Sequence, residues 1–314
     1  MLTQIFILLC SLFLVVFCAN YLVEGAGVIA KKVGVSEFFI GLFIVGMGTS
    51  LPELVVSLVG AIERNSDVAI GNIIGSNIFN TGMILGLSAL IIPIAVSEVN
   101  SRRDIPFMLM ATALFLLFGL SDGGINRLEG GILTLFFAMY VFYLVKTDAH
   151  TVDNTYEVPS GLMFQSLPGS IVLVIGSLIG LIVGGKLFVD SGVQLGSLLG
   201  VSDKIIAITV LAFGTSLPEL ATCLAAVIKK RSQIALGDIV GSNIFNILFI
   251  IGTSSLVRPI GFQNINIVDI MAFTACMLVV FISQHTTHKG IITRFDGGIM
   301  LSIFIIYMVL LFSL

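Results

Sequence analysis

Two glutamates, Glu53 and Glu219, lie inside long apolar segments, each within a copy of the heptapeptide G-T-S-L-P-E-L. The copies occupy Gly48–Leu54 and Gly214–Leu220. A charged side chain at the centre of a bilayer helix costs on the order of 2.5–3.5 kcal/mol on insertion scales. A doubled carboxylate of this kind therefore indicates a functional site, and a role in helix packing alone is the less favoured interpretation.

Each heptapeptide also brings other oxygen atoms close to its carboxylate. Pro52 and Pro218 directly precede the glutamates, and because proline has no backbone N–H, they leave carbonyl oxygens free one turn earlier. A broken helix at membrane depth is tolerated only where it is buried in protein or lines a cavity, and a bound cation is one partner for such carbonyls. Hydroxyl oxygens lie within a turn, at Thr49, Ser50, Thr215 and Ser216.

A second motif follows each glutamate motif. It reads G-N-I-I-G-S-N-I-F-N over Gly71–Asn80 and G-D-I-V-G-S-N-I-F-N over Gly237–Asn246. Polar side chains recur every fourth residue, so each set faces one side of its helix, while the glycines allow close helix approach. Helix packing is the alternative role for these polar residues. The two sets are Asn72, Ser76 and Asn80, and Asp238, Ser242 and Asn246.

All of these candidate ligands are oxygen donors, which favours hard cations such as Ca²⁺ or Na⁺ over zinc, copper or iron. Two glutamates balance one divalent ion or about two monovalent ions, so we expect the two ion types to exclude each other. An occupied site is then close to neutral, whereas an empty one holds two uncompensated carboxylates. No metal-ligand spacing relates the four cysteines, which we expect to be small residues of apolar segments: Cys10, Cys18, Cys223 and Cys276.

The composition is that of a membrane protein. The 314 residues are 57% hydrophobic and only 11% charged, which is too little charge for a soluble surface. The apolar stretch 2–22 has no cleavage site near its end, so we interpret it as a spanning helix rather than a signal peptide. No basic run suggests nucleic acid, and no phosphate-binding glycine loop is present. The expected partner is the lipid bilayer, and the expected energy source is an ion gradient.

The hydropathy pattern predicts an all-α membrane protein with ten transmembrane helices in two five-helix repeats. The first repeat is 1–146, a polar cytoplasmic linker occupies 147–165, and the second repeat is 166–314. A shift of 166 residues aligns the two halves, and a repeat with an odd number of spans is inverted in the membrane. The predicted spans lie near 3–28, 37–62, 68–92, 104–120, 128–146, 167–190, 203–228, 234–257, 267–284 and 295–313.

Charge supports the inverted arrangement. Loop 63–67 (E-R-N-S-D) is nearly neutral, whereas the equivalent loop 229–233 (K-K-R-S-Q) is strongly basic. Inner loops carry the excess of Lys and Arg, so both termini are expected to be extracytoplasmic. We interpret the basic cluster as a topology signal. Glu24 and Asp190 are expected near helix ends, with a gating role left open.

The paired motifs resemble those of the cation/calcium antiporter superfamily, and most closely the compact prokaryotic sodium/calcium exchangers. The resemblance covers the whole chain. It implies a ten-helix fold with a midplane site between the second, third, seventh and eighth helices, and alternating access by sliding of the first and sixth. It further implies Na⁺/Ca²⁺ antiport across the cell inner membrane, with no enzymatic activity and no cofactor beyond the transported ions. A monomer is sufficient, and an oligomer is left open.

The resemblance also implies roles for individual residues. The central Ca²⁺ position would use side chains and backbone oxygens of Glu53, Glu219, Thr49 and Thr215, bordered by Asn80 and Asn246. The flanking Na⁺ positions would use hydroxyls and carbonyls of Ser50, Ser76, Ser216, Ser242, Gly46 and Ala212.

Two positions depart from the family pattern. Some exchangers, including potassium-dependent ones, have an aspartate where this chain has Asn246, so its absence argues against K⁺ co-transport. An acid occurs instead at Asp238, where the first half has Asn72. Eight residues span about 12 Å of helix, so Asp238 cannot take the same coordination position. A structural hydrogen bond is the favoured role, with an access path or a proton site as alternatives.

Other functions fit the same residues less well. The H⁺/Ca²⁺ and K⁺-dependent Na⁺/Ca²⁺ antiporters are the nearest alternatives. A cation channel would usually build its filter by oligomeric symmetry, whereas here one chain supplies both halves. An enzyme with the glutamates as an acid pair would need a nucleophile or water-activating metal, and no such group accompanies them in the sequence.

Overall fold

The computed structural model describes most of the chain. The described residues are 2–147, 164, 166–199, 212–263, 265–285 and 290–313. The predicted linker therefore lies almost entirely outside them, and so do residues 203–211 at the start of the predicted seventh span.

The first half consists of one long helix followed by spans that are divided into shorter helical segments. Three of these segments are π-helical and are labelled η. The helices are α1 (Leu2–Val33), α2 (Glu37–Ile40), η1 (Gly41–Gly46), α3 (Met47–Thr49), α4 (Leu51–Ile62), α5 (Ser66–Ile78), η2 (Phe79–Leu85), α6 (Gly86–Ile91), η3 (Asn100–Asp104), α7 (Ile105–Ser121) and α8 (Arg127–Thr147).

The second half repeats this order. Its described helices are α9 (Leu167–Leu198), α11 (Ala212–Thr215), α12 (Leu217–Ile228), α13 (Ser232–Ile244), η5 (Phe245–Ile250), α14 (Ile251–Val257), α15 (Ile267–Ser283) and α16 (Arg294–Ser313). Two antiparallel ribbons join the halves, because β1 (Ile94–Ala95) pairs with β4 (Ile291–Ile292) and β2 (Gly124–Ile125) pairs with β3 (Ile260–Gly261).

The prediction of a mostly helical membrane protein is confirmed. By length and composition, seven of the described helices can cross a membrane, and the bent pair Glu37–Thr49 and Leu51–Ile62 makes an eighth candidate. The described parts of α12 and α15 are shorter apolar helices. Helices lie over each of the predicted stretches, as far as these are described.

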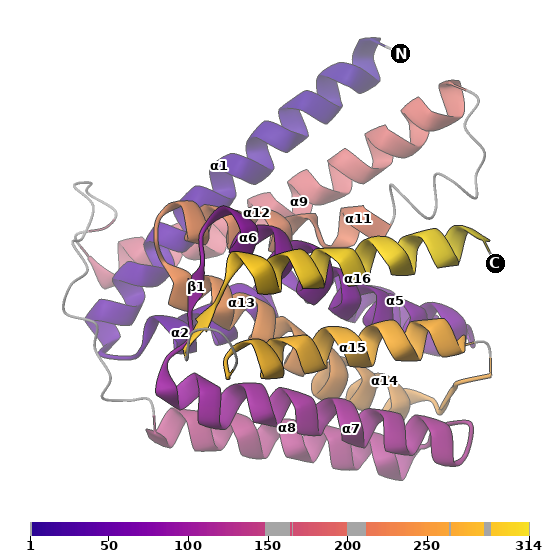
Figure 1. Cartoon of the computed structure of the whole chain (residues 1–314). Helices are drawn as coiled ribbons and strands as arrows, with labels where there is room; N and C mark the ends of the chain where they lie inside the picture. Colours follow the sequence, from indigo (N-terminus) through magenta and orange to yellow (C-terminus); the bar gives the residue numbers. More distant parts are fainter. Residues whose placement is uncertain are drawn as a thin grey trace.

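Two long helices, α1 and α9, pack mainly against each other. α1 and α9 run antiparallel and side by side, obliquely across the other helices, and their ends near the amino terminus project beyond them (Figure 1). A Cβ at Gly184 of α9 would lie 2.8 Å from Val15 of α1, and one at Gly25 of α1 would lie 2.8 Å from Val174 of α9. Small residues thus let the two backbones approach closely.

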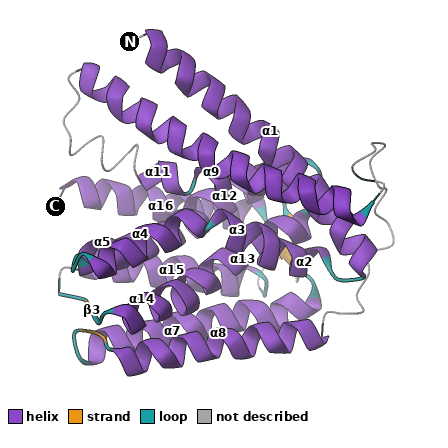
Figure 2. Ribbon diagram, turned by 180° about the vertical axis from the view of Figure 1, so that it is seen from behind, coloured by secondary structure: helices purple, strands orange, loops and turns teal. Residues whose placement is uncertain are grey.

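The helices that carry the second motif form the centre of the molecule. Within the apolar 18-residue stretch of each span, 94% of residues are buried for the span containing α13 and 78% for that containing α5, against 22% for α1. α7 and α8 lie side by side on the face remote from α1 and α9, so the motif helices lie between two outer layers (Figure 2).

Glycines set how closely α13 packs against the second span. A Cβ at Gly241 would lie 2.7 Å from Leu42 Cα, and one at Gly46 would lie 2.6 Å from the Asp238 carbonyl oxygen. The predicted small contact surface is therefore present at Gly241. No described atom lies within 4 Å of a Cβ placed at Gly71 or Gly75.

Candidate cation site

The two glutamates occupy equivalent places in two broken helices. Ser50 (φ −81°, ψ 11°) separates α3 from α4, and Ser216 (φ −93°, ψ 11°) separates α11 from α12. Proline opens α4 and α12, and Glu53 and Glu219 lie in their first turns. The positive end of a helix dipole favours a carboxylate there. The side chains are 1% and 0% exposed, so two carboxylates are buried at the breaks.

Serines cross-link the two carboxylates between the halves of the chain. Ser50 Oγ donates to Glu219 Oε1 at 3.1 Å, and Ser216 Oγ donates to Glu53 Oε1 at 3.4 Å. Ser76 Oγ, from α5, donates to the same oxygen of Glu53 at 3.4 Å. Ser50 and Ser216 therefore each bind the glutamate of the other half, and the structure brings both carboxylates into one site.

The two halves of the site are not identical. Ser242 is the repeat mate of Ser76, but its Oγ donates to the Gly46 carbonyl oxygen at 3.1 Å rather than to Glu219. Thr49 Oγ1 lies 3.2 Å from the same carbonyl. The Gly46 carbonyl oxygen thus accepts from both Thr49 and Ser242, beside the glutamates.

The remaining candidates from the second half are less closely defined. Thr215 is half-buried at the end of α11, next to the break at Ser216. Ala212 is the first described residue of α11, and its side chain lies outside the described part.

Both predicted asparagines are the second residue of a π-helical segment, a distortion that is frequent at functional sites. Asn80 lies in η2 and Asn246 in η5, and they are 1% and 0% exposed. The Asn246 amide Nδ2 donates to Asn77 Oδ1 at 3.1 Å, which links α13 and η5 to α5.

Four oxygens of the predicted ligands are buried without a hydrogen-bond partner among the described residues. They are Glu53 Oε2, Glu219 Oε2, Asn80 Oδ1 and Asn246 Oδ1. Buried polar atoms are normally paired, and a buried carboxylate without compensation is costly. Carboxylate and amide oxygens are the donors that Ca²⁺ and Na⁺ prefer, so the set fits a hard cation.

A second pair of asparagines, which the sequence motifs did not single out, joins the motif helices. Asn243 Nδ2 donates to Thr81 Oγ1 at 2.8 Å, and its repeat mate Asn77 accepts from Asn246. Both are the Asn of G-S-N, one residue after the serine and off the four-residue row. Both copies of the motif have asparagine at this position, and this repetition was the sequence signal that could have identified the pair.

Asp238 makes the hydrogen bond that the sequence favoured. It is fully buried, and Thr222 Oγ1 lies 2.6 Å from its Oδ2. Its repeat mate Asn72 donates instead to Ser57 Oγ at 3.0 Å and to the Glu53 carbonyl at 3.2 Å. Both residues connect a motif helix to the glutamate helix beside it. Asn72 does so as a hydrogen-bond donor and Asp238 as an acceptor.

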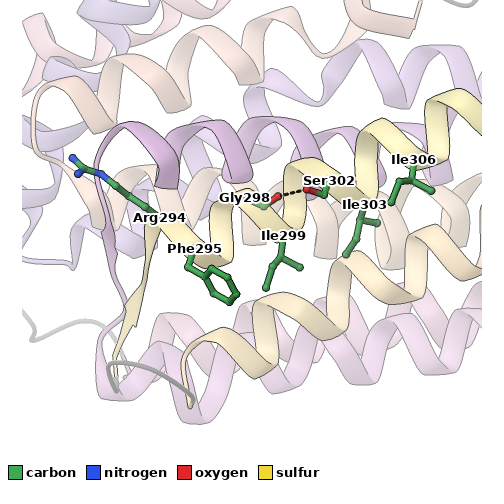
Figure 3. Close-up of a pocket in the computed structure, with 7 residues that line it drawn as sticks. All are labelled: Arg294, Phe295, Gly298, Ile299, Ser302, Ile303 and Ile306. Carbon is green, nitrogen blue, oxygen red and sulfur yellow. Dashed lines mark hydrogen bonds between the residues drawn. The ribbon is translucent and has the colours of Figure 1, made fainter.

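A groove on the outside of the molecule is unrelated to these residues. It follows α16 between Arg294 and Ile306, and its lining is mostly apolar (Figure 3). No carboxylate lines it, and Ser302 donates there to the Gly298 carbonyl of its own helix. The lining residues of the groove therefore lack the carboxylate oxygens that would bind a cation.

Comparison with known proteins matches nearly the whole chain. The sequence model of the family described as "Sodium/calcium exchanger protein" matches residues 3–146 and 169–313. "Sodium/calcium exchanger MaX1" of Methanosarcina acetivorans is 32% identical, over 98% of this chain and 97% of that protein. "Inner membrane protein YrbG" of Escherichia coli K12 is 36% identical, over 81% and 79%. The solved structure of the sodium-calcium exchanger NCX_Mj, soaked with Na⁺ and Ca²⁺, superposes with a TM-score of 0.85 at 32% identity and 98% coverage of both chains.

Proposed function

Because the chain belongs to the sodium/calcium exchanger family, we propose that it is a secondary antiporter that exchanges Na⁺ for Ca²⁺ across the membrane. One observation within the molecule carries this proposal. The serine–glutamate hydrogen bonds between the halves hold two buried carboxylates together, and each carboxylate keeps one oxygen without a partner among the described residues. Such a site can neutralise its charge with one divalent ion or with monovalent ions, but not with both sets at once.

The proposed ligands are those that the family resemblance implies, and the hydrogen bonds of Ser50, Ser76 and Ser216 to the glutamates support them. Glu53 and Glu219 bind Ca²⁺ together with the backbone oxygens of Thr49 and Thr215, and Asn80 and Asn246 border this central position. The Na⁺ positions flank it. Their proposed ligands are Ser50, Ser76, Ser216 and Ser242, with the carbonyls of Gly46 and Ala212.

The proposed architecture is a ten-helix protein of two inverted five-helix repeats, 1–146 and 166–314, joined by a cytoplasmic linker at 147–165. Support comes from the matching order of helices and from the two β ribbons, which connect equivalent places of the halves. Alternating access exposes the site to one side at a time. The proposed location is the cell inner membrane with both termini extracytoplasmic, and a single chain suffices.

Transport is favoured over catalysis because the family is one of exchangers. No cofactor is proposed beyond the transported ions. Coupling to H⁺ or K⁺ instead of Na⁺ alone is distinguished by the composition of the external medium in the experiment below.

The test is Ca²⁺ uptake into Na⁺-loaded proteoliposomes that contain the wild type, Glu53→Gln or Glu98→Gln. Uptake is measured in external choline, Na⁺ and K⁺, and with an imposed pH gradient. We expect uptake that requires the outward Na⁺ gradient and falls at least a hundredfold in Glu53→Gln, because one of two compensating charges is lost, on the order of 3 kcal/mol. Glu98 is an exposed acid outside the site and serves as the matched control.

Each outcome changes the assignment in a defined way. Uptake driven by the pH gradient without Na⁺ would replace the proposal by H⁺/Ca²⁺ exchange. A requirement for K⁺ would make the protein a K⁺-dependent exchanger. Equal loss in Glu53→Gln and Glu98→Gln would contradict the placement of the site.

A further inference from the structure

Two ion pairs tie the turn between α12 and α13 to the start of the chain. The ammonium group of Lys229 pairs with Glu24 of α1, and the guanidinium group of Arg231 pairs with Glu37 of α2. All four side chains are mostly buried. Arg231 also lies against Gly27 of α1, where a Cβ would overlap its guanidinium group. The basic turn therefore contacts α1 directly.

The equivalent turn in the first half has the same left-handed position but lacks the basic charge, because Glu63 and Arg64 occupy the places of Lys229 and Lys230. Lys230 (φ 59°) and its repeat mate Arg64 (φ 66°) are the two described non-glycine residues with a left-handed conformation, so the turn shape is repeated. The repeat mates of Lys229 and Glu24, however, are Glu63 and Asp190. Glu63 and Asp190 are thus two acids at the positions where the other half has the ion pair of Lys229 with Glu24.

Packing shows the same asymmetry. α1 packs along α12, and its buried residues concentrate in its second half, from Cys18 to Ala30. The repeat-related packing would place α9 along α4, and no comparable contact exists between these two described helices. The ends of α1 and α9 near the amino terminus project away from the other helices (Figures 1 and 2).

We propose that the ion pair of Lys229 with Glu24, together with the contact of Arg231 at Gly27, forms a one-sided latch that holds α1 closed against the α12–α13 turn. The inference rests on the proposed function, because a latch matters only if the α1–α9 pair moves between two repeat-related positions. In the second position, Asp190 of α9 would approach Glu63, and their like charges oppose closure there. The charges at the two turns thus favour the conformation in which α1 packs against the basic α12–α13 turn.

The test measures the distance between the far end of α9 and the α4–α5 turn. Spin labels are attached at Leu198→Cys and Val68→Cys, which are 62% and 42% exposed. The background variant has its four native cysteines replaced, and distances are recorded by pulsed electron paramagnetic resonance in lipid nanodiscs.

Breaking the latch in Glu24→Gln or Lys229→Gln is expected to increase the population with a short label distance roughly threefold or more. The charge swap Glu24→Lys with Lys229→Glu should restore the wild-type ratio. Glu63→Lys, which places an opposite charge near Asp190, should also favour the short distance. Glu98→Gln, which breaks the exposed Glu98–Arg102 pair, is the control and should leave the ratio unchanged.

The latch is overturned if Glu24→Gln changes the ratio no more than Glu98→Gln, or if the charge swap does not restore it. Ca²⁺ uptake by the same wild-type sample separates this result from the proposed function. Active exchange without a shift removes only the latch. A latch-dependent shift in a protein that shows no Na⁺-driven uptake removes only the exchange reaction.

Discussion

Each of the two buried carboxylates accepts a hydrogen bond from a serine that belongs to the opposite half of the sequence. Ser50 binds Glu219 and Ser216 binds Glu53, so neither carboxylate is held by its own heptapeptide alone. Hydrogen bonds to charged groups contribute about 1.5–3 kcal/mol each. Because the bonds orient Oε1 of each carboxylate, they also fix the direction of Oε2, which has no hydrogen-bond partner in the described part of the chain.

We predict that Ser50→Ala and Ser216→Ala each weaken Ca²⁺ binding by roughly tenfold, since each removes one oriented hydrogen bond to a carboxylate. Calorimetric titration of the purified protein with Ca²⁺ measures the change. Ser254→Ala is the control, because Ser254 is fully buried and has no hydrogen-bond partner in the described part of the chain. An equal loss of affinity in Ser254→Ala would show that the effect is not specific to the glutamates.

At the scale of elements, the site depends on distorted helices that are packed very closely. Breaks at Ser50 and Ser216 and the π-helical segments η2 and η5 place the ligands at irregular positions along otherwise regular spans. Close packing of α13 on η1 holds these irregular segments in place, and Gly241 makes that approach feasible.

We predict that Gly241→Ala lowers the free energy of unfolding by about 1–3 kcal/mol, because the new methyl group would overlap the Leu42 backbone, which cannot rotate away. Thermal unfolding in detergent, followed by size-exclusion chromatography, reports the loss. Gly298→Ala is the comparison, since no described atom lies within 4 Å of a Cβ there. Equal melting temperatures for the two variants would contradict this account of the α13 contact.

At the scale of the whole molecule, the halves are joined rather than separate. Each β ribbon pairs a strand of one half with a strand of the other, and α1 of the first half packs along α9 of the second. The proposed cation site lies where the four motif segments meet. One half alone would contain one carboxylate and none of the serines that bind it from the other side.

The proposed inverted arrangement predicts that both ends of the chain lie outside the cytoplasm. Alkaline phosphatase fused after residue 314 in a bacterial host should be active, and green fluorescent protein at the same place should be dark. Fusions within the 147–165 linker should give the reverse result, which controls for expression. Fluorescence from the carboxy-terminal fusion would exclude an extracytoplasmic carboxy terminus.

The sequence by itself determined the local chemistry and the approximate spans. Prolines that lack an N–H, carboxylates in apolar segments and polar residues at four-residue spacing are local signals, and they predicted the breaks, the buried acids and the helix faces. The 166-residue repeat further identified equivalent positions, such as Ser50 and Ser216. The prolines, the carboxylates and the four-residue spacing are signals that require only neighbours along one helix.

Only the tertiary structure decided which equivalent residues act alike. Ser76 binds Glu53 while Ser242 binds the Gly46 carbonyl, and Asn72 donates where Asp238 accepts. The π-helical turns and the asparagine contacts between η2 and α13 also required it. The physical reason is that these choices depend on contacts between different helices, two of which join residues 162 and 196 positions apart in the chain, and the pattern of a single helix does not contain them.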